Sequence, residues 1–579
     1  MNQETHSTSF GPAQDKSSGQ AKQCQNCKKE FVIESDDFAF YEKMKVPAPT
    51  FCPDCRLQRR ISFRNERMLY HRVCDLCGKK VISIYHPKGE NVVYCQSCWW
   101  SDSWDPLSYA KEYDFSRPFF EQYYELSKAV PRESLINNNS VNSEYTNLAA
   151  DNKDCYMLFE SSNNERCNHC YWMQLSRDCL DCAFVNNSEL CYETFVAYNC
   201  YKLFFSKECR DCTDSYFLQD CVGCSECYGC VGLRKKQYHI FNKPYSKEEY
   251  LKFLEEKKRQ IKADKIEDLK KAFKEFALTQ INKYAYIQKS IRSTGNYLLN
   301  TKNCTSCFHG DEAENCKYGY HVWRNSKDNM DVSTAGRNAE LIYEGINMGM
   351  DDYNIKFGIQ NWNGDSDLTY CEACSGSSNL FGCISLHGKQ YCIFNKQYTK
   401  EEYEKLVPKI IAHMNEMPYT DKKNRVYKYG EFFPIGLSQF GYNESSAFNH
   451  FPLSKEQAIE KGFSWRDQEE KNVTISGDIV GCSHQGKCSD NCTIGFKIIQ
   501  AERDFYEKMG LPIPTLCPNC RHYERLKQRN PLRLWHRQCM CNKNHPHHSG
   551  KCSNEFETSY ASERPEIVYC ESCYNSEVA

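Results

Sequence analysis

The residues with the most evident chemistry are cysteines arranged in C-x-x-C pairs near the N-terminus. This spacing lets one tight turn aim two thiolates at a metal ion, and two such turns complete a tetrahedral sulfur site that suits Zn²⁺. An iron–sulfur cluster is chemically possible but is less common at this spacing. Taken in order, the pairs predict site one from Cys24, Cys27, Cys52 and Cys55, and site two from Cys74, Cys77, Cys95 and Cys98.

The same pattern recurs near the C-terminus. The stretch "FYEKMKVPAPTFCPDCR" (40–56) returns as "FYEKMGLPIPTLCPNCR" (505–521), and an offset of 465 residues aligns most of the flanking cysteines. The first pair of this copy departs from the pattern, because its spacing is C-x₃-C. The alignment predicts site three from Cys488, Cys492, Cys517 and Cys520, and site four from Cys539, Cys552, Cys570 and Cys573.

Site four contains an insertion, "MCNKNHPHHSGK" (540–551). Cys541 in this insertion is a rival to Cys539, and His545, His547 or His548 could replace a cysteine ligand, because imidazole nitrogen also binds zinc. With one ion in each site, about four zinc ions per chain are expected.

The segment "CQNCKKEFVIESDDFAFYEKMKVPAPTFCPDCRLQRR" (24–60) resembles the predicted zinc-ribbon domain family, which is ribbon-like or treble-clef-like. The resemblance covers about 35 residues at each end. The full chain also resembles multi-zinc-ribbon proteins of small-genome uncultured bacteria. These resemblances imply metal binding at the matching cysteines and no defined activity.

Arginines follow the second cysteine pair in both copies, and several recur every four residues, which places them on one face of a helix. Such a stripe could contact nucleic-acid phosphates, with Tyr70 or Trp535 stacking on a base. The alternative is structural, with each guanidinium paired to a nearby carboxylate. His71 and His536 are expected beside the metal sites and not as ligands. The candidates are Arg56, Arg60, Arg64 and Arg72, and Arg521, Arg525, Arg529 and Arg537.

Thirteen cysteines lie between Cys155 and Cys230, and every gap between them is a multiple of three. A 21-residue spacing also recurs, which predicts a parallel β-helix-like solenoid with cysteines stacked inside. The cluster "CVGCSECYGC" (221–230) is the rival, since four cysteines so close together could bind a metal. An offset of 153 residues aligns this unit with a second one, and both end in a capping box, at Ser246 and Thr399.

The predicted fold is mainly β and multidomain: duplicated double zinc ribbons at both termini flank a central cysteine-rich, parallel β-helix-like solenoid in two units with capping helices. The expected divisions are a disordered tail (1–22), a double zinc ribbon (23–105), a linker (106–137), solenoid unit one (138–245), a helical linker or cap (246–290), solenoid unit two (297–398), a capping helix and connector (399–480), and a second double ribbon (481–579).

Composition and the absence of known motifs reduce the number of functional classes to be considered. The formal net charge is −2, so no overall charge drives binding to nucleic acid or membranes. No signal peptide or membrane-spanning run is evident, and 38 cysteines without an export signal indicate reduced thiols in the cytoplasm. No catalytic motif and no small-molecule site is evident, so an enzyme is not expected. We expect a protein-interaction or structural scaffold, which could self-associate; the alternatives are a zinc-dependent binder of RNA or a ribonucleoprotein, and thirdly a redox or metal-storage protein.

Overall fold

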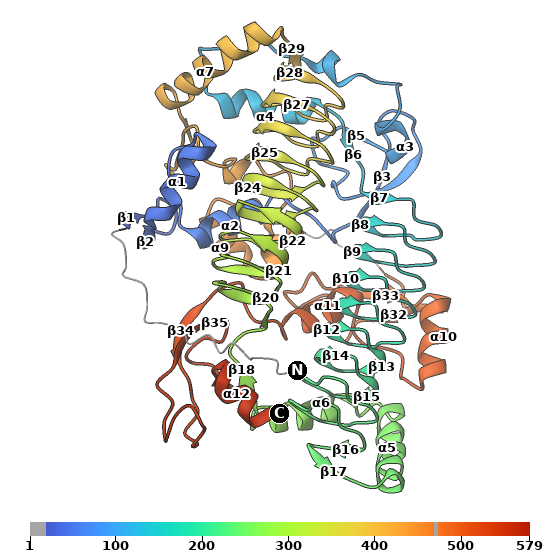
Figure 1. Cartoon of the computed structure of the whole chain (residues 1–579). Coiled ribbons are helices and arrows are strands. Elements are labelled where there is room, and N and C mark those ends of the chain that lie inside the picture. Colours follow the sequence, from blue (N-terminus) through green and yellow to red (C-terminus); the bar gives the residue numbers. More distant parts are fainter. Residues whose placement is uncertain (1–18, 468–472, 579) are drawn as a thin grey trace, which may run out of the picture.

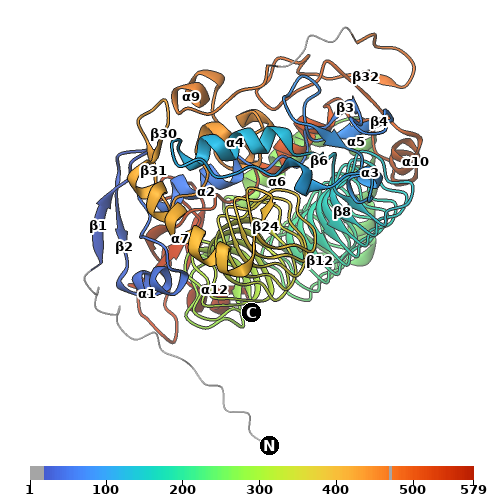
Figure 2. The ribbon, with the colours of Figure 1, turned by 90° about the horizontal axis from the view of Figure 1, so that it is seen from above.

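A computed structural model describes residues 19–467 and 473–578. The chain is rich in strands, and most of them belong to two long parallel ladders that lie side by side (Figures 1 and 2). Most of the tail expected over 1–22 lies outside the described residues, but Gln20–Gln23 already form strand β1. Among the described residues, no helix is long and apolar enough to cross a membrane.

The first ladder has twelve residues between one paired position and the next. For example, Tyr171 pairs with Ala183 and Ala183 pairs with Phe195, always in parallel. Isolated parallel bridges continue the same register to Ile240. The strands are β7 (Asn137–Asn138), β8 (Asn147–Ala150), β9 (Phe159–Ser162), β10 (Tyr171–Gln174), β11 (Ala183–Asn186), β12 (Phe195–Tyr198), β13 (Tyr201–Phe204), β14 (Lys207–Arg210) and β15 (Thr213–Tyr216).

A left-handed backbone conformation recurs at every third residue of this ladder. From Asn139 to Asp220, each third φ lies between 45° and 58°. From Thr146 onward, the residue after each of these positions is buried, as Cys155 and Cys182 are, with at most 2 % of their surface exposed. The chain therefore turns after every three residues and sends one side chain of each three inward.

This geometry accounts for the cysteine spacing. The inward positions are three residues apart, and only small or slender side chains fill them: a buried cluster joins Cys155–Cys230 to residues such as Leu158, Met173 and Ala197. The predicted 21-residue period is wrong, because the structural repeat is twelve residues. The 21-residue spacing arises because 21 is a multiple of three, so both ends fall on inward positions of different columns.

The exposed turns favour Asn and Asp, whose short polar side chains tolerate the left-handed conformation better than other residues do. These side chains also bond along the ladder: Asn187 donates to Asn199 Oδ1 at 2.8 Å, and Asn199 donates to Asp211 Oδ1 at 3.0 Å. The side-chain column thus adds hydrogen bonds outside the backbone pairing.

The second ladder has the same parallel pairing with a repeat of eleven residues between its first two strands and twelve or thirteen after that; Tyr353 pairs with Ser366, and Ser366 with Ser378. Its strands are β19 (Ile287–Gln288), β20 (Gly295–Leu299), β21 (Cys307–Glu314), β22 (Tyr320–Lys327), β23 (Met330–Ala335), β24 (Glu340–Met348), β25 (Tyr353–Lys356), β26 (Ser366–Thr369), β27 (Ser378–Phe381), β28 (Gln390–Ile393) and the antiparallel β29 (Lys396–Gln397).

Each ladder ends in a short antiparallel hairpin followed by a capped helix. The first is β16 (His239–Ile240) with β17 (Lys243–Pro244), then α5 (Lys247–Lys262) and α6 (Ile266–Ala277). The second is β28 with β29, then α7 (Lys400–Glu416). Both capping boxes form, at Ser246 and Thr399, so these helices begin where the sequence predicts.

Aromatic rings join the two ladders. Trp172 of the first stacks on His321 of the second at 3.9 Å between ring centroids, and Phe184 stacks on His309 at 4.8 Å. Burial lowers the pKa of His309 to about 3, so this ring is neutral at physiological pH. The contact therefore behaves as an apolar interface.

The remaining elements flank the ladders, as Figure 2 shows for α1, α2 and α4. The N-terminal elements are β1, β2 (Glu30–Ile33), α1 (Ser35–Met44), α2 (Pro53–Ile61), β3 (Tyr70–Val73), β4 (Lys80–Ser83), β5 (Val93–Tyr94), α3 (Gln96–Trp99), η1 (Pro106–Tyr109), α4 (Phe119–Ala129) and β6 (Arg132–Glu133). The later elements are β18 (Ile281–Lys283), β30 (Tyr419–Thr420), β31 (Val426–Tyr427), η2 (Ile435–Leu437), η3 (Tyr442–Glu444), α8 (Ser446–His450), α9 (Lys455–Glu460), β32 (Ile479–Gly481), β33 (Gly495–Lys497), α10 (Gln500–Met509), α11 (Pro518–Leu526), β34 (Trp535–Gln538), β35 (Glu555–Thr558), β36 (Ile567–Tyr569) and α12 (Glu571–Val578).

The free energy of unfolding should depend on pH through Asp365, whose side chain is fully buried in the second ladder. Burial raises the pKa of Asp365 to about 7, well above the roughly 3.9 of an unfolded aspartate. Because the native state then holds a proton that the unfolded state has lost, this carboxyl reduces stability as pH rises from about 4 to 7.

Asp365→Asn should therefore gain stability over the wild type as pH rises, by about 1 kcal/mol between pH 6 and 8. The amide still accepts the 2.8 Å hydrogen bond from Ser377 N. Urea unfolding followed by circular dichroism measures the difference. Asp367→Asn, at an exposed position of β26 two residues further along the chain, is the control and should show no such trend. An equal response of both variants would contradict the assignment.

Candidate metal centres

Site one gathers the four cysteines that the sequence predicts. Cys24 and Cys27 lie in the turn between β1 and β2, and Cys52 and Cys55 lie at the start of α2. Their sulfur atoms are all within 4.8 Å of one another, and Cys27 Sγ is 3.7 Å from Cys52 Sγ. The amide of Asn26 donates to Cys55 Sγ at 3.2 Å. This donor set and spacing fit a tetrahedral zinc ion.

Site two repeats this construction with Cys74, Cys77, Cys95 and Cys98. The first two lie in the turn between β3 and β4, and Cys95 is the N-cap of α3. Burial alone would raise the pKa of Cys95, but hydrogen bonds from the Ser97 hydroxyl and the Cys98 backbone lower it to about 6. A thiolate, the form that binds metal, is therefore favoured here.

Site three differs from the prediction at its first ligand. The group that the structure brings together is Cys482, His484, Cys492 and Cys520, with Cys517 Sγ 3.5 Å from Cys520 Sγ. Cys482 directly follows β32, as Cys24 directly follows β1, so it and not Cys488 takes the position of Cys24. Cys488 lies in the loop between the strands, with its sulfur 3.5 Å from that of Cys520.

The sequence contained a signal for Cys482 that the offset alignment missed. "SGQAKQC" ends at Cys24 and "SGDIVGC" ends at Cys482, so S-G-x₄-C marks the first strand and first ligand of both copies. The insertion between Cys482 and Cys492 hides this match, because it supplies Cys488 near the aligned position.

Site four contains the predicted Cys539, Cys552, Cys570 and Cys573, all buried. One hydrogen bond is common to all four sites: the backbone N–H of the third cysteine donates to the sulfur of the first. The donors and acceptors are Cys52 to Cys24 at 3.2 Å, Cys95 to Cys74 at 3.2 Å, Cys517 to Cys482 at 3.3 Å and Cys570 to Cys539 at 3.2 Å. The recurrence identifies the same hairpin-and-helix unit four times.

A fifth group lies beside site four. Cys541, His545 and His548, which the sequence offered as replacements for a site-four ligand, gather with Cys573. Cys539 keeps its place in site four, so the two groups share Cys573. His547 Nε2 is also 3.3 Å from Cys573 Sγ, but its side chain is exposed.

The ladder cysteines belong to none of these groups in the described part of the chain. Cys221, Cys224, Cys227 and Cys230 are inward-facing and buried, and each thiol points at backbone carbonyl oxygens; Cys221 Sγ, for example, is 3.6 Å from Cys230 O. Burial raises the pKa of Cys179, a similar residue, to about 11. The four side chains pack in the buried interior of the ladder.

The arginine stripe of α2 is buried against the second ladder. Arg56 Nε donates to Asp331 Oδ2 at 2.8 Å, and Arg60 Nη1 donates to Asp331 Oδ1 at 3.1 Å. Arg59, which the stripe did not include, bridges Glu344 and Glu431. Because these guanidinium groups are enclosed and paired, they are not free to bind phosphate, and the structural alternative accounts for them.

The second stripe repeats this arrangement on the first ladder. Arg521 and Arg525 of α11 both pair with Asp181, which is fully buried, and Arg521 also reaches Glu502 at 3.1 Å. Phe505 packs on Tyr192 of this ladder, with ring centroids 6.0 Å apart.

The repeated "FYEKM" segment has the same use in both copies. Phe40 packs on Tyr343 of the second ladder at 5.9 Å between centroids, as Phe505 does on Tyr192 of the first. Tyr41 and Tyr506 contact the same two rings. The N-terminal copy thus docks on the second ladder and the C-terminal copy on the first.

The other predicted side chains also have internal partners. Arg64 pairs with Glu66 and Glu160, and Arg529 donates to the Asn449 carbonyl at 2.7 Å. Arg72 pairs with Asp75, and Arg537 donates to the Ala561 carbonyl at 3.2 Å. His71 contacts Tyr145, and His536 contacts Glu555 and Glu557, so neither ligates a metal group described above.

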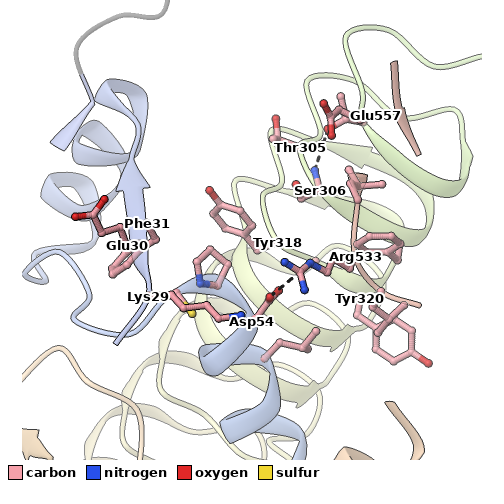
Figure 3. A pocket seen from close by; sticks show the side chains of 18 residues that line it. Lys29, Glu30, Phe31, Asp54, Thr305, Ser306, Tyr318, Tyr320, Arg533 and Glu557 are labelled. Carbon is pink, nitrogen blue, oxygen red and sulfur yellow. Dashed lines mark hydrogen bonds and ion pairs between the residues drawn. The ribbon is translucent and has the colours of Figure 1, made fainter. Parts of the chain in front are cut away.

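A pocket of about 550 Å³ opens where site one, the second ladder and the β34–β35 hairpin meet (Figure 3). Its lining combines apolar side chains such as Leu57 and Phe308 with charged ones such as Lys29 and Glu557. Arg533 reaches toward Asp54 across it at 3.9 Å. No nucleophile–base pair is evident among its lining residues.

No protein-family model matches the chain, and no curated protein matches it. A solved crystal structure of a "putative acetyltransferase" from Desulfovibrio desulfuricans G20 is similar over 51% of this chain and 87% of that chain, with 11% sequence identity and a TM-score of 0.11. A likeness this weak carries no argument about fold or activity.

Zinc counting tests the corrected ligand of site three. Cys482→Ser should lower the zinc content by about one ion per chain, because it removes the first ligand of that site. Cys488→Ser is the matched control and should leave the content unchanged. Elemental analysis of the purified full chain measures both. A loss of zinc from Cys488→Ser alone would restore the sequence-based ligand set.

The buried ion pairs predict a large cost for removing one partner. Asp331→Asn leaves Arg56 and Arg60 without a full counter-charge and should lower the free energy of unfolding by about 3–5 kcal/mol. Asp328→Asn, which loses an exposed pair with Lys43 on the same ladder, should cost less than about 1 kcal/mol. Denaturant unfolding measures both. Similar losses in the two variants would show that the buried pair does not hold this interface.

Proposed function

We propose that this chain is a non-enzymatic, zinc-dependent structural scaffold for protein partners, in which zinc ribbons fasten two β-solenoids together. The observation that carries the proposal is the crossed docking: α2 pairs with Asp331 of the second ladder, and α11 pairs with Asp181 of the first. Each of these helices begins at metal-site cysteines and carries the arginines that pair with a ladder aspartate. A metal ion that fixes the start of the helix would therefore also fix its contact with the ladder.

The solenoid assignment rests on the twelve-residue repeat with a left-handed residue at every third position. This pattern corresponds to a coil with four sides of three residues each. Each side sends one side chain inward, and these side chains stack from coil to coil and fill the interior. Solenoids bury a continuous core between neighbouring coils and present long surfaces to partners. The ladder is therefore suited to rigid display and not to a conventional active-site cleft.

Zinc is the metal that the donor sets favour. Sites one, two and four each offer four cysteine sulfurs, and closed sites of this kind leave no position for a catalytic water. They supply folding free energy instead, in line with the resemblance of both ends to zinc ribbons. None of the 38 cysteines forms a disulfide, which suits a reducing compartment such as the cytoplasm.

The main alternative, nucleic-acid binding, loses its strongest support because six of the eight candidate arginines pair with carboxylates of the protein, five of them with buried carboxylates. A redox or metal-storage function would need accessible thiols, whereas the ladder cysteines are at most 2 % exposed. Neither alternative is favoured by a particular feature of the described residues.

Removal of zinc tests the proposal. Chelation should release both ends from the ladders, lower the melting temperature by about 10 °C or more, and increase the radius of gyration in small-angle scattering. Readdition of zinc in reducing buffer should reverse both changes. If the chelated protein keeps its melting temperature and size, zinc does not hold the scaffold together.

The partner assignment has its own test. The zinc-loaded chain should capture specific proteins or itself, and chelated protein should lose them. RNA binding that weakens steeply with salt would instead favour the nucleic-acid alternative.

A further inference from the structure

The insertion at 540–551 gives site four a second group of four donors beside the first, which the groups at sites one to three do not have among the described residues. In site two the first two ligands, Cys74 and Cys77, belong to one short turn. In site four the equivalent ligands are Cys539 and Cys552, and the residues between them add Cys541, His545 and His548. The insertion thus brings three zinc-type donors to a site that already has four.

The inserted hairpin holds its donors in place through backbone bonds. His545 and His548 exchange backbone hydrogen bonds at 2.9 and 3.2 Å, and Cys552 N donates to Cys541 O at 2.9 Å. The result is a tight loop that folds back over α12, where Cys573 lies. His548 Nε2 is 3.1 Å from Cys573 Sγ.

The contacts around the histidines select the form that binds metal. His548 Nδ1 is 3.1 Å from the Gly550 carbonyl, which can only accept, so Nδ1 carries the proton and Nε2 keeps its lone pair. Glu577 Oε1 lies 3.4 Å from His545 Nε2, and Lys543 pairs with the same carboxylate. A carboxylate or carbonyl behind a ligating imidazole is the usual outer support of a zinc site.

The net negative charge of a four-thiolate zinc site would favour a second metal ion beside site four. Four thiolates around one zinc ion leave a buried net charge of about −2. Cys539, Cys541, Cys570 and Cys573 are at most 1 % exposed, so this charge is poorly solvated. A second divalent ion that recruits the Cys541 thiolate and two neutral imidazoles brings the pair to about −1.

We propose that the C-terminal ribbon holds a binuclear zinc centre in which the Cys573 thiolate bridges two ions. One ion has Cys539, Cys552, Cys570 and Cys573, and the other has Cys541, His545, His548 and Cys573. Both ligand sets lie within 4.8 Å internally. His547 is excluded from the second set, because its side chain is exposed and does not join that group. This inference rests on the proposed function only in taking the bound metal to be zinc.

Native mass spectrometry of the zinc-loaded full chain under reducing conditions counts the ions directly. The wild type should carry five zinc ions: two in the binuclear centre and one in each of sites one to three. His548→Ala should lose one ion. Cys573→Ser should lose two, because the bridging ligand serves both. His547→Ala is the matched control and should keep all five.

Four ions in the wild type, unchanged in His548→Ala, would overturn the binuclear centre and leave site four as a single site with four cysteine ligands. Four ions that fall to three in His548→Ala would also overturn it, since the histidine group would then hold the only ion. The wild-type count needs no variant, so a misfolded mutant does not remove the test. A chain that binds no zinc at all would overturn the proposed function as well.

Discussion

The architecture depends on two similar contacts, in each of which a buried ladder aspartate pairs with two arginines. Asp331 and Asp181 each occupy a turn position of a ladder, with φ of 57° and 55°, yet both are covered by a ribbon helix. Burying a carboxylate and two guanidinium groups is expensive, and it succeeds only where geometry lets each charge find its partners. Such a contact therefore specifies one docking position more than it adds stability.

The crossed arrangement gives the internal duplication a structural reason. Each half of the chain contributes a pair of cysteine groups and a ladder, and a helix that begins at one of these groups packs on the ladder of the other half. The same three elements recur in both contacts: an arginine pair, the Phe–Tyr step of the preceding helix, and a ladder tyrosine, Tyr343 or Tyr192. Because the ends of the chain meet the opposite halves, neither half completes its interface alone.

The sequence allowed the local chemistry to be predicted well. Fourteen of the sixteen proposed cysteine ligands lie in the candidate metal groups, since C-x-x-C turns and the "FYEKM…CPxCR" repeat encode local geometry. Cys517 and Cys488 lie outside these groups, each with its sulfur 3.5 Å from Cys520 Sγ. The strand-rich class and both capping boxes were also accessible. Cys488 was predicted in place of Cys482 because the stretch inserted between Cys482 and Cys492 puts another cysteine near the aligned position.

Long-range features were not accessible in the same way. The coil length depends on left-handed residues at every third position, and Leu175 or Phe184 in that conformation contradicts their intrinsic preference, so local propensity could not reveal it. The partners of the arginines are remote in sequence, 271 residues away for Arg60 and 340 for Arg521. A stripe of basic residues looks alike in sequence whether its counter-charge is a phosphate or a distant aspartate.

One residue type serves two opposite purposes here, and the surroundings decide which. In the ladders, cysteine side chains fill the narrow buried interior, and burial raises the pKa of one of them, Cys179, to about 11. In the ribbons, backbone N–H groups and a helix N-terminus surround the sulfur, and the pKa of Cys95 falls to about 6. All five candidate metal groups among the described residues lie in the terminal segments, where a hairpin turn and a helix start bring the sulfur atoms together, and none lies in the ladders.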